Sequence, residues 1–105
     1  MFTFLKKIAL LSPLYKYQIS GKSMEPTLPA GDSILVNRVA YLFAKPQQDD
    51  IIALHDPRDG KILIKRISKV TGNSYFVQGD NKNSSTDSRV FGMIERGDIV
   101  GKVIA

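Results

Sequence analysis

The sequence predicts a mostly β protein, a small single-domain antiparallel β-sheet or barrel, and two patterns support this fold class. Five short runs rich in β-branched residues are typical of strands, and they cover residues 33–38, 50–55, 61–70, 74–78 and 98–103. Between them lie clusters of Gly, Pro, Asn and Asp, the residues that tight turns select, at 29–32, 56–60, 71–73 and 79–81. One helical turn is expected at 39–44, and a length of 105 residues fits one small domain.

The composition excludes several kinds of chemistry. With 43% hydrophobic and 24% charged residues, the chain has enough apolar material for a modest core. Because it has no cysteine, disulfides, thiolate nucleophiles and cysteine zinc sites are excluded. Its single histidine, His55, lacks the paired spacing of zinc ligands, so we predict no metal and no other cofactor. The 15 basic residues give a net charge of +5 but are scattered, so we do not expect nucleic-acid binding.

Residues 1–18 are predicted to form an N-terminal arm ahead of the main domain, residues 19–105. The arm has an apolar start, then Lys6 and Lys7, then a second apolar run interrupted by Pro13. A helix that spans a bilayer needs about 20 apolar residues, so we do not expect the arm to cross as a simple helix. We favour a helix or an extended arm packed on the domain. The alternative is an amphipathic arm, residues 1–17, that makes a peripheral contact with a membrane surface.

Ser23 is the candidate nucleophile, because glycine and proline restrict the turn around it. Pro26 and Pro29 enforce an extended, kinked path after the serine, and Gly21 allows close backbone approach before it. Such a turn can aim the Ser23 amide at a developing oxyanion. The Gly-x-Ser-x-Gly elbow of α/β-hydrolases is excluded, because Glu25 occupies the place of its second glycine.

The base that would activate Ser23 is predicted to be Lys65 rather than His55. His55 ends an apolar strand beside a turn, where a histidine needs no catalytic role. A lysine is a base only when it is neutral, which requires burial among apolar groups. In a strand, Leu63 and Ile67 share the face of Lys65 and supply that setting. The alternative is that Lys61, Lys65 and Lys69 are exposed charges on an edge strand, where they would oppose aggregation.

In ordered blocks from about Ile19 to Val103, the chain resembles the type I signal peptidases, serine endopeptidases with a Ser/Lys dyad. Residues 23–28 resemble the nucleophile box, and residues 31–36 resemble the strand that follows it. Lys65-Arg66 resembles the general-base box, and residues 79–89 with Gly92 resemble the last box. The resemblance implies a fold of the signal-peptidase type, with residues 19–105 as the catalytic domain. Only residues 67–78 separate the general-base box from Gly79, which leaves no room for the large domain that bigger members insert.

The resemblance also implies a role for each matching residue. Ser23 would attack the scissile carbonyl, and Lys65 would take its proton and return it to the leaving amine. The supporting group would be Ser85, which orients the lysine amine, with an ion pair between Asp87 and Arg89. The substrate groove and the turns beside the site would be built by Gly21, Met24, Pro26, Gly79, Asp80 and Asn81. The substrate would be a precursor protein or leader peptide, bound in extended form by strand pairing.

Two departures from the family pattern keep other readings open. Gly21 stands where some members have a serine that donates to the oxyanion, so the Ser23 amide would act without that hydroxyl. Typical members begin with spanning helices, and none is expected in this chain, which leaves a membrane-associated or a cytoplasmic location open. The compact chain also resembles the nickel-type superoxide dismutase maturation proteases. A self-cleaving repressor-type domain and a catalytically silent peptide-binding module are the remaining alternatives.

Overall fold

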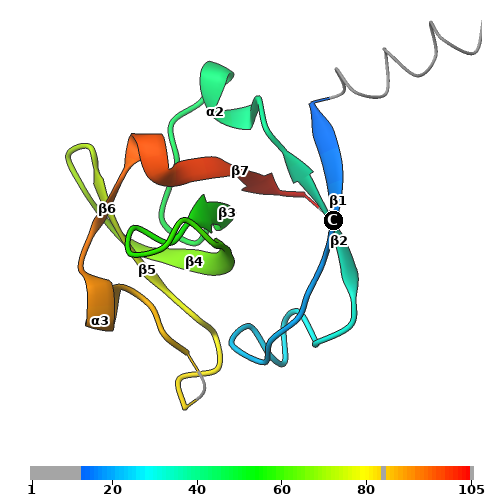
Figure 1. Cartoon of the computed structure of the whole chain (residues 1–105). Coiled ribbons are helices and arrows are strands. Elements are labelled where there is room, and N and C mark those ends of the chain that lie inside the picture. Colours follow the sequence, from blue (N-terminus) through cyan, green and yellow to red (C-terminus); the bar gives the residue numbers. More distant parts are fainter. Residues whose placement is uncertain (1–12, 84, 105) are drawn as a thin grey trace, which may run out of the picture.

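The fold is one antiparallel sheet of seven strands (Figure 1), in a computed structural model that describes residues 13–83 and 85–104. The strands lie in the order β1-β2-β7-β3-β4-β5-β6. Their bounds are β1 (Leu14–Gln18), β2 (Ser33–Asn37), β3 (Ile51–His55), β4 (Ile62–Thr71), β5 (Ser74–Gln78), β6 (Ile94–Glu95) and β7 (Ile99–Val103). Two helical turns, α2 (Ala40–Phe43) and α3 (Ser88–Phe91), and a 3₁₀ turn, η1 (Arg96–Asp98), complete the described elements.

The predicted fold class is confirmed: the chain is mostly β and every strand pair is antiparallel. The five predicted strands are β2, β3, β4, β5 and β7, and the predicted helical turn contains α2. Residues 1–12 of the predicted arm lie outside the described residues, and residues 14–18 form β1, which pairs with β2. The two-residue β6 and the turn α3 have no counterpart among the predicted elements, because both are too short to show a period.

The core lies in two clusters on the sheet, and both include residues of the buried strand β3. One cluster surrounds Ile52 and Leu54, and the other includes Ala53. Alternation explains this division, because successive side chains of a strand point to opposite faces. The central strand β3 is therefore covered on both faces and holds its neighbour β4 rigidly.

Strand β4 changes partner along its length, and this change creates the site. Its first half pairs with β3, and its second half pairs with β5 from Arg66 onward, with a register shift between Ile67 and Lys69. Residues 62–65 therefore pair with a strand on one side only, and the chain after β1 runs past their other side. Figure 1 shows the loop between β1 and β2 and the loop after β5 at the lower end of the molecule.

Candidate active site

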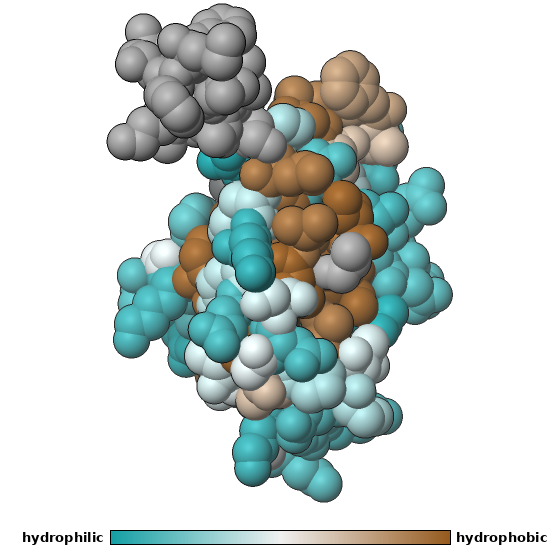
Figure 2. All heavy atoms as spheres, turned by 90° about the vertical axis from the view of Figure 1, so that its right-hand side faces the viewer, coloured by the Kyte–Doolittle hydropathy of each residue, from teal (hydrophilic) through white to brown (hydrophobic). Residues whose placement is uncertain are grey.

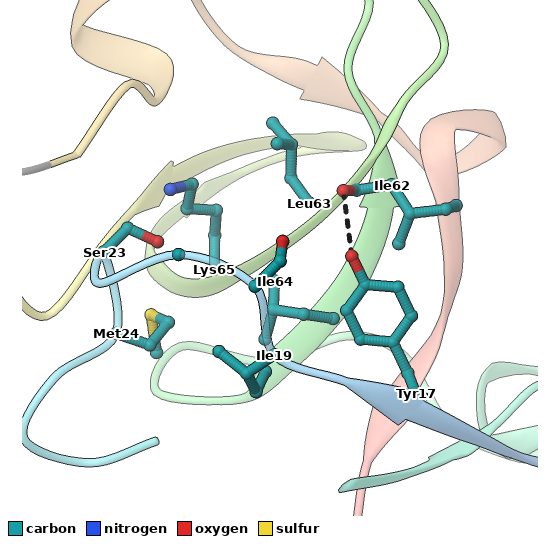
Figure 3. A pocket seen from close by; sticks show the side chains of 10 residues that line it. Tyr17, Ile19, Ser23, Met24, Ile62, Leu63, Ile64 and Lys65 are labelled. Atoms are coloured by element: carbon teal, nitrogen blue, oxygen red, sulfur yellow. Dashed lines mark hydrogen bonds between the residues drawn. The ribbon is translucent and has the colours of Figure 1, made fainter. Parts of the chain in front are cut away.

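A pocket of about 120 Å³ lies between the chain that follows β1 and the first half of β4. Its lining residues are Tyr17, Ile19, Ser20, Gly21, Ser23 and Met24 on one side and Ile62, Leu63, Ile64 and Lys65 on the other. Figure 3 shows apolar side chains along its length and the polar tips of Ser23 and Lys65 close together at one end. The pocket thus places the two predicted dyad residues, which are far apart in sequence, on one surface.

Lys65 is buried, as the catalytic hypothesis requires. Its side chain is only 3% exposed, whereas Lys61 and Lys69 on the same stretch are exposed. Burial lowers the pKa of the Lys65 ammonium below its ordinary value; the carboxylate of Asp87 opposes this shift and the guanidinium of Arg89 adds to it. The alternative of an exposed edge lysine is therefore wrong for Lys65.

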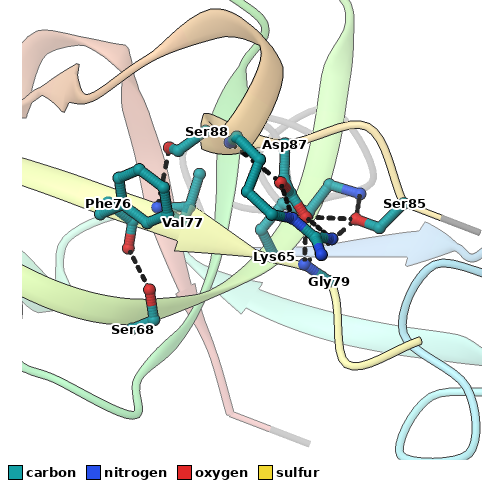
Figure 4. Close-up of polar contacts among 9 residues, drawn as sticks. Lys65, Ser68, Phe76, Val77, Gly79, Ser85, Asp87 and Ser88 are labelled. Atoms are coloured by element: carbon teal, nitrogen blue, oxygen red, sulfur yellow. Dashed lines mark hydrogen bonds and ion pairs between the residues drawn. The ribbon is translucent and has the colours of Figure 1, made fainter. Parts of the chain in front are cut away.

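Ser85 fixes the direction of the lysine amine. The Nζ of Lys65 donates a hydrogen bond of 3.2 Å to Ser85 Oγ, and the backbone N–H of Gly79 donates to the same oxygen at 3.1 Å. Ser85 in turn donates its own proton to Asp87 Oδ2 at 2.7 Å. Since this proton is committed to Asp87, the Ser85 oxygen can only accept from the amine (Figure 4).

Asp87, which accepts the proton of Ser85, is fully buried, at 0% exposure. Its carboxylate accepts from the Ser85 hydroxyl, from the Gly79 N–H at 3.0 Å and from Arg89 through Nε at 2.9 Å and NH2 at 2.8 Å. Burial alone would raise the pKa of Asp87, but the hydrogen bonds from Arg89, Ser85 and Gly79 hold it well below its usual range. A carboxylate that is ionised at neutral pH thus anchors Ser85, the serine that holds Lys65.

The turn after β5 also holds the loop that carries Ser23. The backbone N–H of Asn81 donates to the Ser23 carbonyl at 2.8 Å, and Asn81 Nδ2 donates to the Lys22 carbonyl at 3.1 Å. Gly79 approaches this loop so closely that a Cβ there would collide with the Ser23 carbonyl oxygen and the Ser85 side chain. The predicted site turn, Gly79 to Asn81, therefore connects the loop of the nucleophile to the lysine side of the site.

Two residues without a predicted role complete this connection, Thr27 and Arg66. Asp80 accepts from Thr27 Oγ1 at 2.6 Å and pairs with Arg66 through two hydrogen bonds of 2.9 Å. Arg66 also donates to the carbonyl of Asp49 at 2.9 Å. These groups come from the nucleophile loop, β4 and the turn after β5, and no local pattern reveals a pairing across 53 positions.

The structure places the other predicted residues as follows. Gly21 and the buried Met24 line the pocket, while Pro26 is exposed on the same loop and does not line it. His55 is exposed, and its Nδ1 lies 3.0 Å from the Gly60 carbonyl. Across residues 13–83 and 85–104, no three His, Asp or Glu side chains gather in a way that could hold a metal ion. Within the same residues, no helix is long and apolar enough to cross a bilayer.

Comparison with known proteins assigns the family. The chain is 33% identical to the mitochondrial ATP-independent inner membrane protease subunit 1b of Arabidopsis thaliana, over 80% of this chain and 64% of that protein. It is 28% identical to signal peptidase I V of Bacillus subtilis, over 83% and 82%, and 32% identical to human mitochondrial inner membrane protease subunit 1, over 80% and 63%. The chain thus spans just under two thirds of the length of the two mitochondrial relatives. The family model for signal peptidase, peptidase S26, matches residues 1–73 and 67–105, and the chain belongs to that family.

Proposed function

We propose that this chain is a serine endopeptidase in which Ser23 and Lys65 form the catalytic dyad, and that it removes N-terminal signal or leader peptides from precursor proteins. The observation that carries the proposal is the buried Lys65 amine, which shares a pocket with Ser23 and is held by Ser85. A buried lysine with a lowered pKa is suited to act as a general base. Membership in the signal peptidase family supports the same chemistry.

The hydrogen bonds around Ser85 suggest how the base is oriented. A neutral lysine amine has two N–H groups and one lone pair, and one N–H is directed at Ser85 Oγ. The lone pair is then free to accept the proton of Ser23 as its oxygen attacks the scissile carbonyl. The resulting ammonium returns this proton to the leaving amine, and a water molecule releases the acyl group by the same route. Ser85, Asp87 and Arg89 act as positioning residues, since they reach the reaction through Lys65.

The oxyanion is assigned to the backbone N–H of Ser23. In the part of the chain that the structure describes, no acceptor takes this N–H, whereas the carbonyl of the same peptide unit, that of Lys22, is held by Asn81 Nδ2 and by the Glu25 N–H, both at 3.1 Å. A fixed peptide plane with a free N–H is the arrangement that stabilises a tetrahedral intermediate. Gly21 contributes no hydroxyl donor, so the Ser23 amide supplies this stabilisation without it.

The substrate is proposed to bind as an extended strand along residues 62–65 of β4. This stretch pairs with β3 on one side only, and its other side faces the pocket. Main-chain hydrogen bonds would then give affinity, and the pocket would select the side chains. A pocket of about 120 Å³ with walls of Ile19, Met24 and Ile64 suits small apolar side chains next to the cleaved bond.

Two relatives are named inner membrane proteases, and we propose that this chain also works at a membrane surface. Residues 1–17 are the proposed peripheral contact, since they combine apolar side chains with Lys6, Lys7 and Lys16. The precursor would then be cleaved outside the bilayer, at the end of its leader.

Cleavage of a leader peptide by single variants tests the dyad. We expect Ser23→Ala and Lys65→Met each to reduce cleavage to background, because one lacks the attacking oxygen and the other the base. Ser33→Ala and Lys69→Met are matched controls, since both residues are exposed and lie away from the pocket. Circular dichroism confirms that each variant folds. Undiminished cleavage by folded Ser23→Ala or Lys65→Met contradicts the proposal.

A further inference from the structure

The helical turn α2 exposes two large apolar side chains at the upper end of the molecule, away from the catalytic pocket. Phe43 is 87% exposed and Leu42 is 71% exposed, the two highest values among the exposed large hydrophobic residues that the structure describes. Two adjacent large side chains that stay this exposed form an apolar tip, and burying such a tip against an apolar partner is favourable. In Figure 1, α2 is the uppermost labelled element, while α3 lies at the lower left.

Contacts of Tyr41 hold the turn α2 against the domain, so Leu42 and Phe43 project from a fixed position. Tyr41, the residue before Leu42, packs against the core and donates from its hydroxyl to Asp50 Oδ2 at 2.8 Å. Arg96 donates to the Tyr41 carbonyl at 2.9 Å, and its guanidinium lies 5.4 Å from the centre of the Tyr41 ring. Tyr41 thus fixes α2 to the domain, and Leu42 and Phe43 project from this support.

The charge of Lys45 and the position of Pro13 indicate which kind of partner α2 contacts. Lys45 is exposed shortly after Phe43, a basic group beside an apolar tip. The carbonyl of Pro13 accepts from the N–H of Arg38 at 2.7 Å, so the segment before Pro13 joins the domain beside the start of α2. That segment carries Lys6 and Lys7 among apolar residues. In Figure 2, which keeps the vertical axis of Figure 1, apolar surface reaches the upper end of the molecule.

We propose that Leu42 and Phe43 insert into the interface of an anionic lipid bilayer, with Lys45 at the level of the headgroups. Apolar side chains that enter the headgroup boundary supply affinity by burial, and neighbouring lysines add attraction to anionic lipids. This contact is separate from the proposed contact of residues 1–17 and gives the domain a second point of attachment. Two attachment points restrict rotation of the domain relative to the bilayer more than one attachment point does.

The chain offers an unusually direct test because it contains no tryptophan. In the full chain, Phe43→Trp places a single fluorophore at the tip of α2, and Val90→Trp is the control, since Val90 is 64% exposed but lies on α3. With vesicles of phosphatidylglycerol and phosphatidylcholine, we expect the tryptophan emission of the Phe43→Trp variant to shift to shorter wavelength. Brominated lipid should quench the same emission. The emission of the Val90→Trp variant should stay unchanged.

A second variant measures how much Leu42 and Phe43 contribute to the affinity for vesicles. In the full chain, Leu42→Ser with Phe43→Ser should weaken co-sedimentation with the anionic vesicles about tenfold or more, since two large side chains no longer leave water. Circular dichroism checks the fold of each variant.

Four outcomes would overturn the inference. In the first, the emission of the Phe43→Trp variant does not shift although the protein still sediments with vesicles. In the second, the emission shifts equally with neutral vesicles, and in the third it shifts with rising protein concentration when no vesicles are present. In the fourth, the double variant sediments with vesicles as well as the wild type does. The first leaves the contact of residues 1–17 standing. A failure of wild-type protein to sediment contradicts both membrane proposals and leaves the cleavage proposal untouched.

Discussion

Two stretches of this chain, Asp56-Pro57-Arg58 and Asp87-Ser88-Arg89, build the same local ion pair. In each, the aspartate Oδ1 accepts from the arginine N–H and Nε, and Oδ2 accepts from the arginine NH2 at 2.8 Å. Both carboxylates are buried, Asp56 at 4% exposure and Asp87 at 0%. An aspartate two residues before an arginine therefore forms the same set of hydrogen bonds with it at both places.

The two pairs differ in what else the aspartate holds. Asp87 also accepts from the Ser85 hydroxyl and the Gly79 N–H, and Ser85 accepts from Lys65. Asp56 has no such extra donors among the hydrogen bonds of the described residues. The same local motif is thus a structural turn at one place and, at the other, the support of the serine that holds Lys65, because only the tertiary fold brings Ser85 and Lys65 together beside Asp87.

The largest difference in activity between the two ion pairs is expected when Asp87→Asn is compared with Asp56→Asn. We expect Asp87→Asn to lower kcat about 10²-fold, because a neutral amide has one acceptor oxygen for donors that occupy both oxygens of the carboxylate, so Ser85 and the lysine amine are held less firmly. It should also lower the free energy of unfolding by about 1–3 kcal/mol, because buried donors lose their acceptor. Asp56→Asn should lower stability with little change in kcat. Peptide cleavage and urea unfolding measure both quantities, and an equal fall in kcat would remove the distinction.

A smaller effect is expected from Gly79→Ala, which leaves both ion pairs in place. The added Cβ would meet the Ser23 carbonyl oxygen and the Ser85 side chain, so the nucleophile loop must move away from Lys65. Such overpacking typically costs about 1–3 kcal/mol. We expect kcat to fall by roughly tenfold or more. Gly97→Ala is the control, since a Cβ at Gly97 meets no atom within 4 Å. Activity of Gly79→Ala equal to that of Gly97→Ala would mean that the close approach has no functional role.

The pH dependence of cleavage gives a subtler comparison. Activity should rise as pH increases, because Lys65 acts only when neutral, and its lowered pKa brings this rise below that of an ordinary lysine. The Asp87 carboxylate favours the ammonium, and Asp56 does so as a lesser cause. The residual activity of Asp87→Asn should therefore rise at lower pH than that of the wild type. For Asp56→Asn the shift has the same direction and is smaller. A pH-independent kcat/KM between about pH 6 and 9 would exclude a lysine base.

The smallest expected effect concerns stability in acid. Hydrogen bonds lower the pKa of both Asp56 and Asp87 in the folded protein, so the unfolded chain takes up protons first as pH falls. Each carboxylate stabilises the fold above about pH 4, and this stability is lost as pH falls from there toward the folded pKa. Measured by urea unfolding between about pH 7 and pH 3, the free energy of unfolding should fall less steeply for either Asn variant than for the wild type. A decline as steep as in the wild type would show that the altered carboxylate does not contribute.

The sequence by itself determined five of the seven strands and singled out Ser23 and Lys65 as the candidate dyad. Residues 33–37 and 74–78 alternate between the core and the surface, and this alternation is visible in the sequence because it depends on neighbouring residues alone. The local pattern allowed a buried Lys65, since Leu63, Ile64 and Ile67 surround it in sequence, but the Ser23 segment and the block after Gly79 were needed to favour it over an exposed edge lysine. Ser23 was singled out by its flanking Gly and Pro.

Only the tertiary structure decided what these groups touch. It joined Asn81 to the Ser23 loop, and Thr27 and Arg66 to Asp80. The contact of Ser85 with Lys65 was expected from the family resemblance, and the structure supplied its geometry. It also gave Asp87 a different role from Asp56, although both stand two residues before an arginine. The physical reason is that each of these hydrogen bonds needs donor and acceptor within about 3 Å, and the sheet order and the partner change of β4 set that proximity for residues that are far apart in the chain.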